Sequence, residues 1–143
     1  MSENTRGGSA LSLLIGLVAI YIACKYWQRR RLLRELRATR ITVAELRQKL
    51  EAGENPVLLD LRSSAELKLY TSVIRGSVHV EVDEIEAHSQ AMPRDREIIV
   101  YCSCPNEITS ARITLLLKRK GFTRIRLLQG GIDAWRKNNY PME

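Results

Sequence analysis

The segment Glu97–Tyr101, which reads Glu-Ile-Ile-Val-Tyr, restricts the possible folds more than any other part of the sequence. It is short, apolar and rich in β-branched residues, and it does not alternate between apolar and polar positions. A strand of this kind has both faces buried, as interior strands of parallel sheets do. Parallel strands are joined by crossover segments, usually helices, that pack on the faces of the sheet. The segment therefore indicates an α/β fold.

Strand and helix signals alternate through residues 41–143. Thr42 and Glu45 have capping-box spacing and open a helix that ends at Gly53. Further strands are predicted at 57–60, 77–80 and 125–128, and further helices at 65–70, 83–88, 110–119 and 132–138. This order predicts a mostly parallel central sheet with helices on both faces.

An uncharged apolar run precedes this domain, from Ala10 to Cys24. Lys25 can extend toward the headgroups, and Tyr26 and Trp27 suit the membrane interface, so the usable segment is 10–27. At 1.5 Å per residue it covers about 27 Å, just enough for a bilayer core of about 30 Å. We therefore expect a short tail at 1–9, a transmembrane helix at 10–27 and a basic juxtamembrane linker helix at 28–40.

Arginines follow the apolar run at once, in the segment QRRRLLRELRATR, whereas residues 1–9 hold one acid and one base. By the positive-inside rule, this asymmetry predicts a single-pass protein of the cytoplasmic (inner) membrane with its domain facing the cytoplasm. A cleaved signal peptide, a lipoprotein anchor at Cys24 and a buried core helix remain as alternatives.

The positive charge of the chain is concentrated in this N-terminal part. Residues 1–40 hold eight basic and two acidic residues, whereas 41–143 hold 15 basic and 14 acidic residues. A nucleic-acid-binding domain carries its positive charge on the folded domain, so no nucleic-acid partner is expected. Three cysteines and two histidines provide neither a disulfide scaffold nor enough ligands for a typical zinc site, and no metal or cofactor is predicted.

The candidate chemistry lies where the buried strand ends. Cys102, Ser103 and Cys104 form a loop between that strand and the predicted helix at 110–119. Open α/β sheets bind ligands at the carboxyl ends of their strands, and a helix N-terminus offers free N–H groups and partial positive charge. Such a position favours a thiolate and therefore a reactive cysteine, although a cysteine after a strand is also a common inert core residue.

Five short motifs follow one another in an order typical of one family. They are Val57–Arg62 with its Asp-x-Arg, Ile74–Ser77, Val100–Cys102, Lys120–Phe122 and Leu128–Trp135 with its Gly-Gly-x-x-Ala-Trp. Together they cover about 100 residues, and the segment 41–143 resembles a single rhodanese (sulfurtransferase) domain. The resemblance implies a membrane-anchored rhodanese in which a loop cysteine accepts sulfane sulfur as a persulfide and passes it to a nucleophile. The partners implied are a small sulfur donor or a protein persulfide.

The loop departs from the family pattern because it is two residues longer and contains Cys-x-Cys. Cys102 directly follows the strand, as the family nucleophile does, whereas Cys104 has the family spacing to Ser110. We favour Cys102 as the catalytic residue, with Cys104 as the alternative, because the sheet fixes the strand end and loop insertions cost little free energy.

The remaining site residues follow from this placement. The expected substrate-binding set around the loop is Ser103, Asn106, Thr109, Ser110 and Arg112. Asp60 and Arg62 are expected to support the first loop by hydrogen bonds. Pro105 removes an N–H donor and Glu107 repels anions, which favours a persulfide, polysulfide or protein-borne donor over thiosulfate.

Two other functions compete with sulfur transfer. A cysteine-loop phosphatase needs an arginine about six residues after its cysteine, but that position holds Ile108 or Ser110. A non-catalytic rhodanese-fold binding module, or a redox-sensing domain that uses the two cysteines, stays open.

Overall fold

The computed structural model describes residues 5–103 and 107–143, and the chain forms two units that meet after Ala38. The first unit is one helix, α1 (Thr5–Ala38). Its apolar side chains from Leu11 to Trp27 are exposed, and by length and composition alone its part Ser9–Arg37 is long and apolar enough to cross a membrane. Helix α1 runs without a break through the predicted segment at 10–27 and on to Ala38 in the predicted linker, and Arg40 begins a strand.

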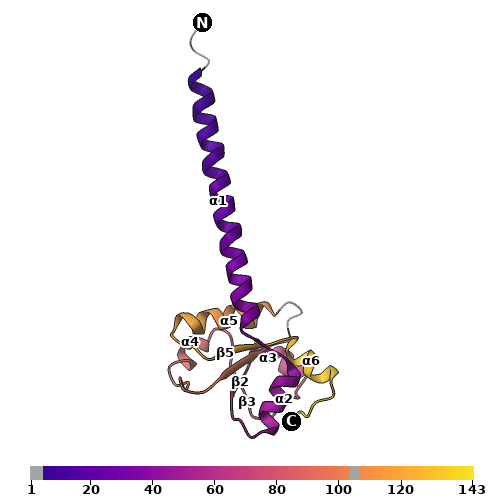
Figure 1. Cartoon of the computed structure of the whole chain (residues 1–143). Helices are drawn as coiled ribbons and strands as arrows, with labels where there is room; N and C mark the ends of the chain where they lie inside the picture. The colour runs from indigo at the N-terminus through magenta and orange to yellow at the C-terminus, as the bar shows by residue number, and fades with distance from the viewer. Residues whose placement is uncertain (1–4, 104–106) are drawn as a thin grey trace. The chain divides into compact units, whose positions relative to one another are not determined.

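The second unit is built on a five-stranded parallel sheet in the order β1-β5-β4-β2-β3 (Figure 1). Its strands are β1 (Arg40–Ile41), β2 (Val57–Asp60), β3 (Ser77–His79), β4 (Ile98–Tyr101) and β5 (Ile125–Leu128). The predicted α/β fold is confirmed, with β4 as its central strand. Only β1 was missed, because two residues, one of them an arginine, carry no strand pattern.

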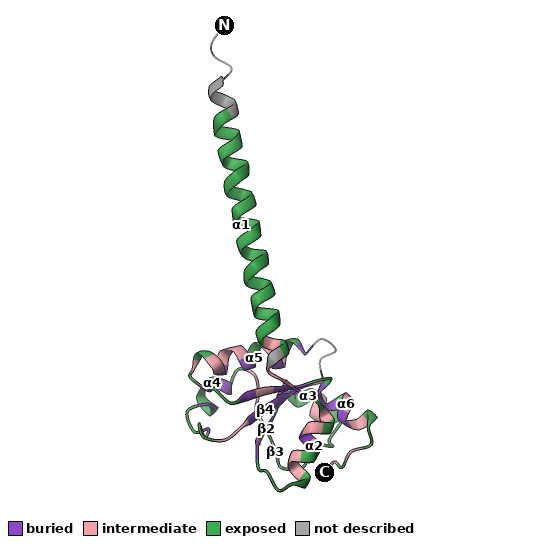
Figure 2. Ribbon diagram, viewed as in Figure 1, coloured by how far each residue is buried: buried purple, intermediate pink, exposed green. Residues whose placement is uncertain are grey.

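Residues of β2, β4 and β5 enter two separate cores on the two faces of the sheet. Leu58, Ile99 and Leu128 pack on one face with Leu46 of α2 (Val43–Glu51) and Trp135 of α6 (Gly131–Lys137). The other core contains Leu59, Val100, Leu127 and Ile85 of α4 (Ile85–His88), with Ile113 and Leu117 of α5 (Ile108–Arg119). Figure 2 shows the buried strands β2 and β4 in the middle of this unit. This two-sided burial explains the continuous apolar strand sequence.

The capping box lies at a different helix from the one predicted. Thr42 accepts a hydrogen bond from the Glu45 amide at 3.1 Å, but the Glu45 carboxylate binds Arg126 at 2.6 Å instead of returning to the cap. The complete box is formed by Ser63 and Glu66 at the start of α3 (Ser64–Leu69). Glu66 thereby has a fixed position beside the carboxyl ends of the strands.

Candidate active site

The loop after β4 begins inside the protein core. Cys102 is 2% exposed and packs in the same core as Val100 and Ile113. Its carbonyl oxygen accepts a hydrogen bond from the Ile132 amide at 3.1 Å. Ser103 follows and is half-buried. The predicted site residues Cys104 and Asn106 lie outside the described residues.

A two-glycine turn closes over the backbone of Cys102. Gly130 and Gly131 have φ values of 76° and 56°, in the left-handed region that favours glycine. A Cβ atom at Gly131 would collide with the Cys102 carbonyl oxygen. Glycine at this position therefore allows α6 to begin directly against the cysteine loop.

Glu107 precedes α5 and connects three segments. Its backbone is left-handed at φ 53°, and the residue is only 8% exposed. Its carboxylate accepts a hydrogen bond from the Gly130 amide. Arg40 of β1 forms an ion pair with the same carboxylate at 3.0 Å. The carboxylate expected to repel anions is thus engaged by a cation and an amide.

The first turn of α5 contributes an unusual hydroxyl group. Ser110 is fully buried, and its Oγ has no hydrogen-bond partner among the residues that the structure describes. Thr109 is half-buried in the same turn. An unpaired buried hydroxyl costs free energy, which makes Ser110 available to a ligand that can accept its hydrogen bond.

Arg112 lies two residues after Ser110 on α5 and is exposed. It lines a cavity between α4 and α5 together with Asp83, Glu86 and Arg119. A second, separate cavity is lined by Ser103 of the cysteine loop. Arg112 is close to the cysteine loop in sequence, but it does not line the cavity beside Ser103.

Asp60 and Arg62 form a buried ion pair at the end of β2. The Arg62 Nη2 atom lies 2.6 Å from Asp60 Oδ2, and both side chains are almost completely buried. Arg62 also donates to the carbonyls of Tyr70 and Ser72, at 3.1 and 3.0 Å. Burial is the largest single effect and lowers the pKa of Arg62, but the hydrogen bonds to Asp60 and the attraction of nearby negative groups together exceed it and raise this pKa.

Tyr101 completes this buried network from β4. Its hydroxyl donates to Asp60 at 3.0 Å and lies 2.9 Å from Ser77 Oγ. Burial, reinforced by the nearby Asp60 carboxylate, raises the pKa of Tyr101. The network ties together the carboxyl ends of β2 and β4 and the start of β3, and so fixes the platform from which the cysteine loop departs.

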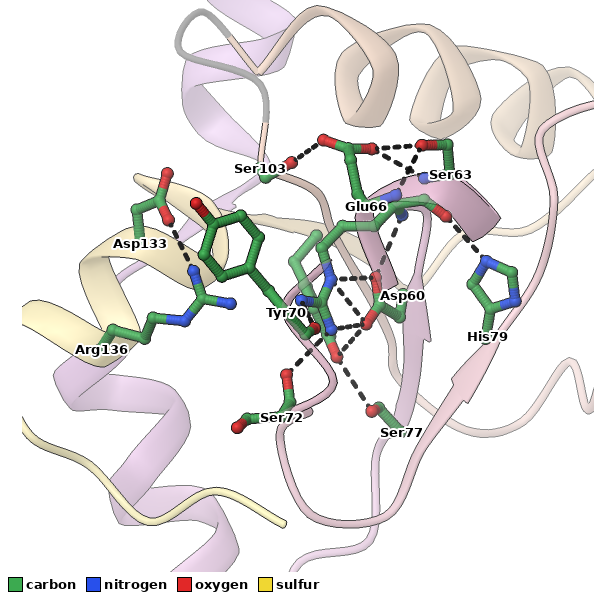
Figure 3. Close-up of polar contacts among 12 residues, drawn as sticks. Asp60, Ser63, Glu66, Tyr70, Ser72, Ser77, His79, Ser103, Asp133 and Arg136 are labelled. Carbon is green, nitrogen blue, oxygen red and sulfur yellow. Dashed lines mark hydrogen bonds and ion pairs between the residues drawn. The ribbon is translucent and has the colours of Figure 1, made fainter. Parts of the chain in front are cut away.

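Glu66 joins α3 to the cysteine loop, a contact the sequence analysis missed. Its carboxylate accepts hydrogen bonds from the Ser103 hydroxyl and, at 2.8 Å, from the Ser63 amide (Figure 3). These bonds, with that from Ser103 the strongest, lower the pKa of Glu66. The Ser63-x-x-Glu66 capping box was a signal for the helix start, but nothing in the sequence indicates the partner in the loop.

A cavity of about 310 Å³ opens beside Ser103. It is lined by Arg62, Glu66, Tyr70, Ser103, Asp133 and Arg136. Arg136 of α6 forms an ion pair with Asp133 at 3.2 Å and stacks over Tyr70 at 5.1 Å (Figure 3). Among the described residues, no three His, Cys, Asp or Glu side chains gather in a way that would hold a metal ion.

Comparisons with known proteins agree with this fold. A family model for the rhodanese-like domain matches residues 42–138. A sulfurtransferase of Allochromatium vinosum is 28% identical over 97 residues, which cover 68% of this chain and 87% of that protein. The thiosulfate sulfurtransferase GlpE of Actinobacillus succinogenes is 29% identical over 90 residues, covering 63% of this chain and 78% of that protein.

Solved structures give the same result. The crystal structure of a rhodanese-related protein from Thermoplasma volcanium superimposes with a TM-score of 0.62 at 27% identity, and the match covers 73% of this chain and 96% of that one. The similarity thus spans nearly the whole of the smaller protein.

Proposed function

The chain belongs to the family of rhodanese-like domains and is a sulfurtransferase of that family, and from this premise we propose that it carries sulfane sulfur as a persulfide on a cysteine of the loop after β4. The observation that supports this most directly is the position of Cys102-Ser103-Cys104, between the carboxyl end of β4 and the N-terminus of α5. Backbone N–H groups there favour a thiolate and an anionic donor.

The reaction divides into two half-reactions. The loop thiolate attacks the sulfane sulfur of the donor, the donor's S–S bond breaks, and its electron pair leaves with the donor remnant, which is sulfite when the donor is thiosulfate. An acceptor nucleophile then attacks the outer sulfur of the persulfide, and the cysteine sulfur leaves as the original thiolate. No external oxidant or reductant is consumed, since both steps are displacements at sulfur.

Burial of Cys102 bears on which cysteine is the nucleophile. A thiol that is 2% exposed and packed in an apolar core is poorly placed to attack a donor from solvent. Cys104 also stands six residues before Ser110, the spacing usual in the family. We therefore propose Cys104, the sequence-based alternative, as the nucleophile, and Cys102 as a core residue that fixes the start of the loop.

Ser110 is the best-supported substrate-binding residue of those predicted. Its buried hydroxyl has no partner among residues 5–103 and 107–143, and it lies in the first turn of α5, where backbone N–H groups have no acceptor within the helix. Ser103 and Thr109 flank the loop, and we keep both in the binding set with Asn106. Arg112 is the weakest member, because it lines the cavity between α4 and α5.

Thiosulfate is a suitable donor in spite of the acidic residue in the loop. The Glu107 carboxylate is paired with Arg40 and the Gly130 amide, so its charge is compensated locally. A relative of this chain is a thiosulfate sulfurtransferase. We propose thiosulfate as one donor, beside polysulfide and protein persulfides.

Helix α1 is proposed to anchor the domain in the cytoplasmic membrane. It exposes an apolar surface from Leu11 to Trp27 and carries five arginines between Gln28 and Ala38. Such a helix is also compatible with a signal sequence, which would be removed. The arginines that follow the apolar run favour retention with the domain on the cytoplasmic side.

The test measures sulfur transfer by the full-length chain in detergent, with thiosulfate or polysulfide as donor and cyanide as acceptor. Cys102→Ser and Cys104→Ser are compared with the unmodified chain. We expect Cys104→Ser to abolish turnover and Cys102→Ser to retain a measurable part of it. The reverse pattern would assign the reaction to Cys102, and inactivity of the unmodified chain with both donors would favour a non-catalytic binding module.

A further inference from the structure

The cavity beside Ser103 has a composition that suits one class of sulfur acceptor. Ser103 lines this cavity and belongs to the cysteine loop, between Cys102 and Cys104 in the sequence, so the cavity opens at that loop. Its volume of about 310 Å³ is at the lower end of the range for small-molecule pockets. The cavity therefore limits its ligand to a small molecule.

The charges that line the cavity are mixed and not equally available. Arg62 is neutralised by Asp60, with both side chains buried, so it adds no free charge. Glu66 is held by Ser63 and Ser103. The remaining pair is Asp133 and Arg136, whose side chains are 64% and 31% exposed. With Glu66, this pair gives the cavity one net negative charge.

This charge pattern disfavours an anion that lacks a positive group. A dianion such as thiosulfate would meet two carboxylates and one guanidinium. A zwitterion, by contrast, can place its carboxylate on Arg136 and its ammonium group on Asp133. The ion pair between these two side chains is partly exposed and spaced i,i+3 on α6, so separating it costs little free energy.

We infer that this cavity binds the sulfur acceptor, and that the acceptor is a small amino-acid thiol with a carboxylate and an ammonium group on one carbon atom. The acceptor thiolate attacks the outer sulfur of the loop persulfide and forms a new S–S bond. The bond between that sulfur and the cysteine Sγ breaks, and its electron pair returns to Sγ. The inference rests on the proposed sulfurtransferase activity and names the acceptor class for that site.

Arg136 and Asp133 would then select the acceptor by its charged groups. Tyr70 supports this arrangement, because its ring lies under the Arg136 guanidinium at 5.1 Å and keeps it at the cavity. A guanidinium binds a carboxylate through two parallel hydrogen bonds, which a cyanide ion or a simple amine cannot provide.

The test compares acceptors that differ only in charged groups, with the full-length chain in detergent and thiosulfate as donor. The acceptors are cysteine, 3-mercaptopropionate, which lacks the ammonium group, cysteamine, which lacks the carboxylate, and cyanide. The variants are Arg136→Gln and Asp133→Asn. Lys137→Gln is the matched control, since Lys137 is an exposed cation on the same helix that does not line the cavity.

The expected result is a change in selectivity. Arg136→Gln should lower the ratio of kcat/KM for cysteine to that for cysteamine about tenfold, as expected for the loss of a charge-assisted bidentate contact. Asp133→Asn should lower the ratio of cysteine to 3-mercaptopropionate about fivefold. Lys137→Gln should leave both ratios unchanged. Each ratio is compared between a variant and the unmodified chain, so differences in the intrinsic reactivity of the thiols cancel.

Equal losses for every acceptor, or no loss in Arg136→Gln, would overturn the inference while leaving the sulfurtransferase activity intact. If the chain has no activity even with cyanide, the proposed function fails separately, and direct binding of S-methylcysteine tests the cavity. Saturable binding that Arg136→Gln weakens about tenfold would support the site as an amino-acid pocket. Absence of binding to the unmodified chain would refute it.

Discussion

The carbonyl oxygen of Cys102 occupies the space in which a side chain at Gly131 would begin. The same oxygen accepts the Ile132 amide hydrogen bond, so the start of α6 is held directly against the cysteine loop. The Gly130-Gly131 motif, which forms a left-handed turn, therefore has a second role. It sets the distance between α6, which carries Asp133 and Arg136, and the loop that carries the cysteines.

Replacement of Gly131 by alanine should disrupt both stability and activity. The new Cβ atom would meet backbone, which cannot move aside, and φ at this residue is 56°. We expect Gly131→Ala to lower the free energy of unfolding by about 3 kcal/mol. Gly53→Ala is the control, because Gly53 has φ 79° but open space around it, and it should cost only about 1 kcal/mol. Thermal unfolding followed by near-UV circular dichroism measures both; similar losses in the two variants would contradict this account.

The sequence predicted most of the fold because the strands are fixed by local composition. β5 was predicted to the residue and β4 to within one, since their apolar runs match burial on two faces. The contact between Glu66 and Ser103 could not be predicted in this way. It depends on how α3 and the β4 loop meet in space, and the residues are 37 positions apart.

The two capping-box sequences illustrate the same limit. Thr42-x-x-Glu45 and Ser63-x-x-Glu66 have equivalent patterns, yet only the second forms the full box. Arg126, which is remote in sequence, competes for the Glu45 carboxylate. Arg112 shows the corresponding limit for the site, because its nearness to the loop in sequence did not reveal which side of α5 it lies on.

Ser110 should separate stability from function. Its buried hydroxyl lacks a partner in the described part of the chain, so Ser110→Ala removes an unsatisfied polar group and should raise the free energy of unfolding by about 1 kcal/mol. The same variant should lower kcat/KM for thiosulfate about tenfold, because the donor loses a hydrogen bond in a buried site.

Thr114→Val is the control for Ser110→Ala on the same helix. The Thr114 hydroxyl donates to the Ser110 carbonyl at 2.7 Å, so its loss should destabilise the protein by about 1 kcal/mol. Turnover should be little affected. A Ser110→Ala variant that loses stability and keeps full activity would show that its hydroxyl is a structural group.

Breaking the buried Asp60–Arg62 ion pair should lower the free energy of unfolding more than breaking the partly exposed Asp133–Arg136 pair. Asp60→Asn leaves the Arg62 charge buried without its anion and should cost about 3–5 kcal/mol. Asp133→Asn breaks a partly exposed pair and should cost less than about 1 kcal/mol. Urea unfolding of the two variants measures the difference. Comparable losses would mean that the network of Arg62 with Tyr70 and Ser72 compensates for the missing carboxylate.

The stability that Glu66 contributes to the folded chain should decrease at low pH. Its pKa is lowered in the folded chain from an ordinary value of 4.5, so its contribution is complete above that value. The contribution is lost as the pH falls through the lower pKa of the folded state. The difference in thermal stability between the unmodified chain and Glu66→Gln should therefore be constant from pH 7 to about pH 5 and shrink at lower pH. A difference that grows on acidification would exclude this carboxylate as the titrating group.

The membrane anchor should depend on the arginines that follow the apolar part of α1. Residues 1–9 contain only Glu3 and Arg6, whereas Arg29, Arg30 and Arg31 directly follow the apolar run. In a bacterial host, we expect the full chain to stay in the membrane after a carbonate wash, with an intact mass that includes residues 10–27.

Alkaline phosphatase fused after Glu143 should be inactive, because it requires export to fold with its disulfides. Replacing the three arginines with glutamine should make an increased fraction of the fusion active, since the charge difference that sets orientation is then reduced. A chain cleaved near Cys24, or a fusion that is already active before substitution, would instead identify α1 as a signal sequence or as an anchor of the opposite orientation.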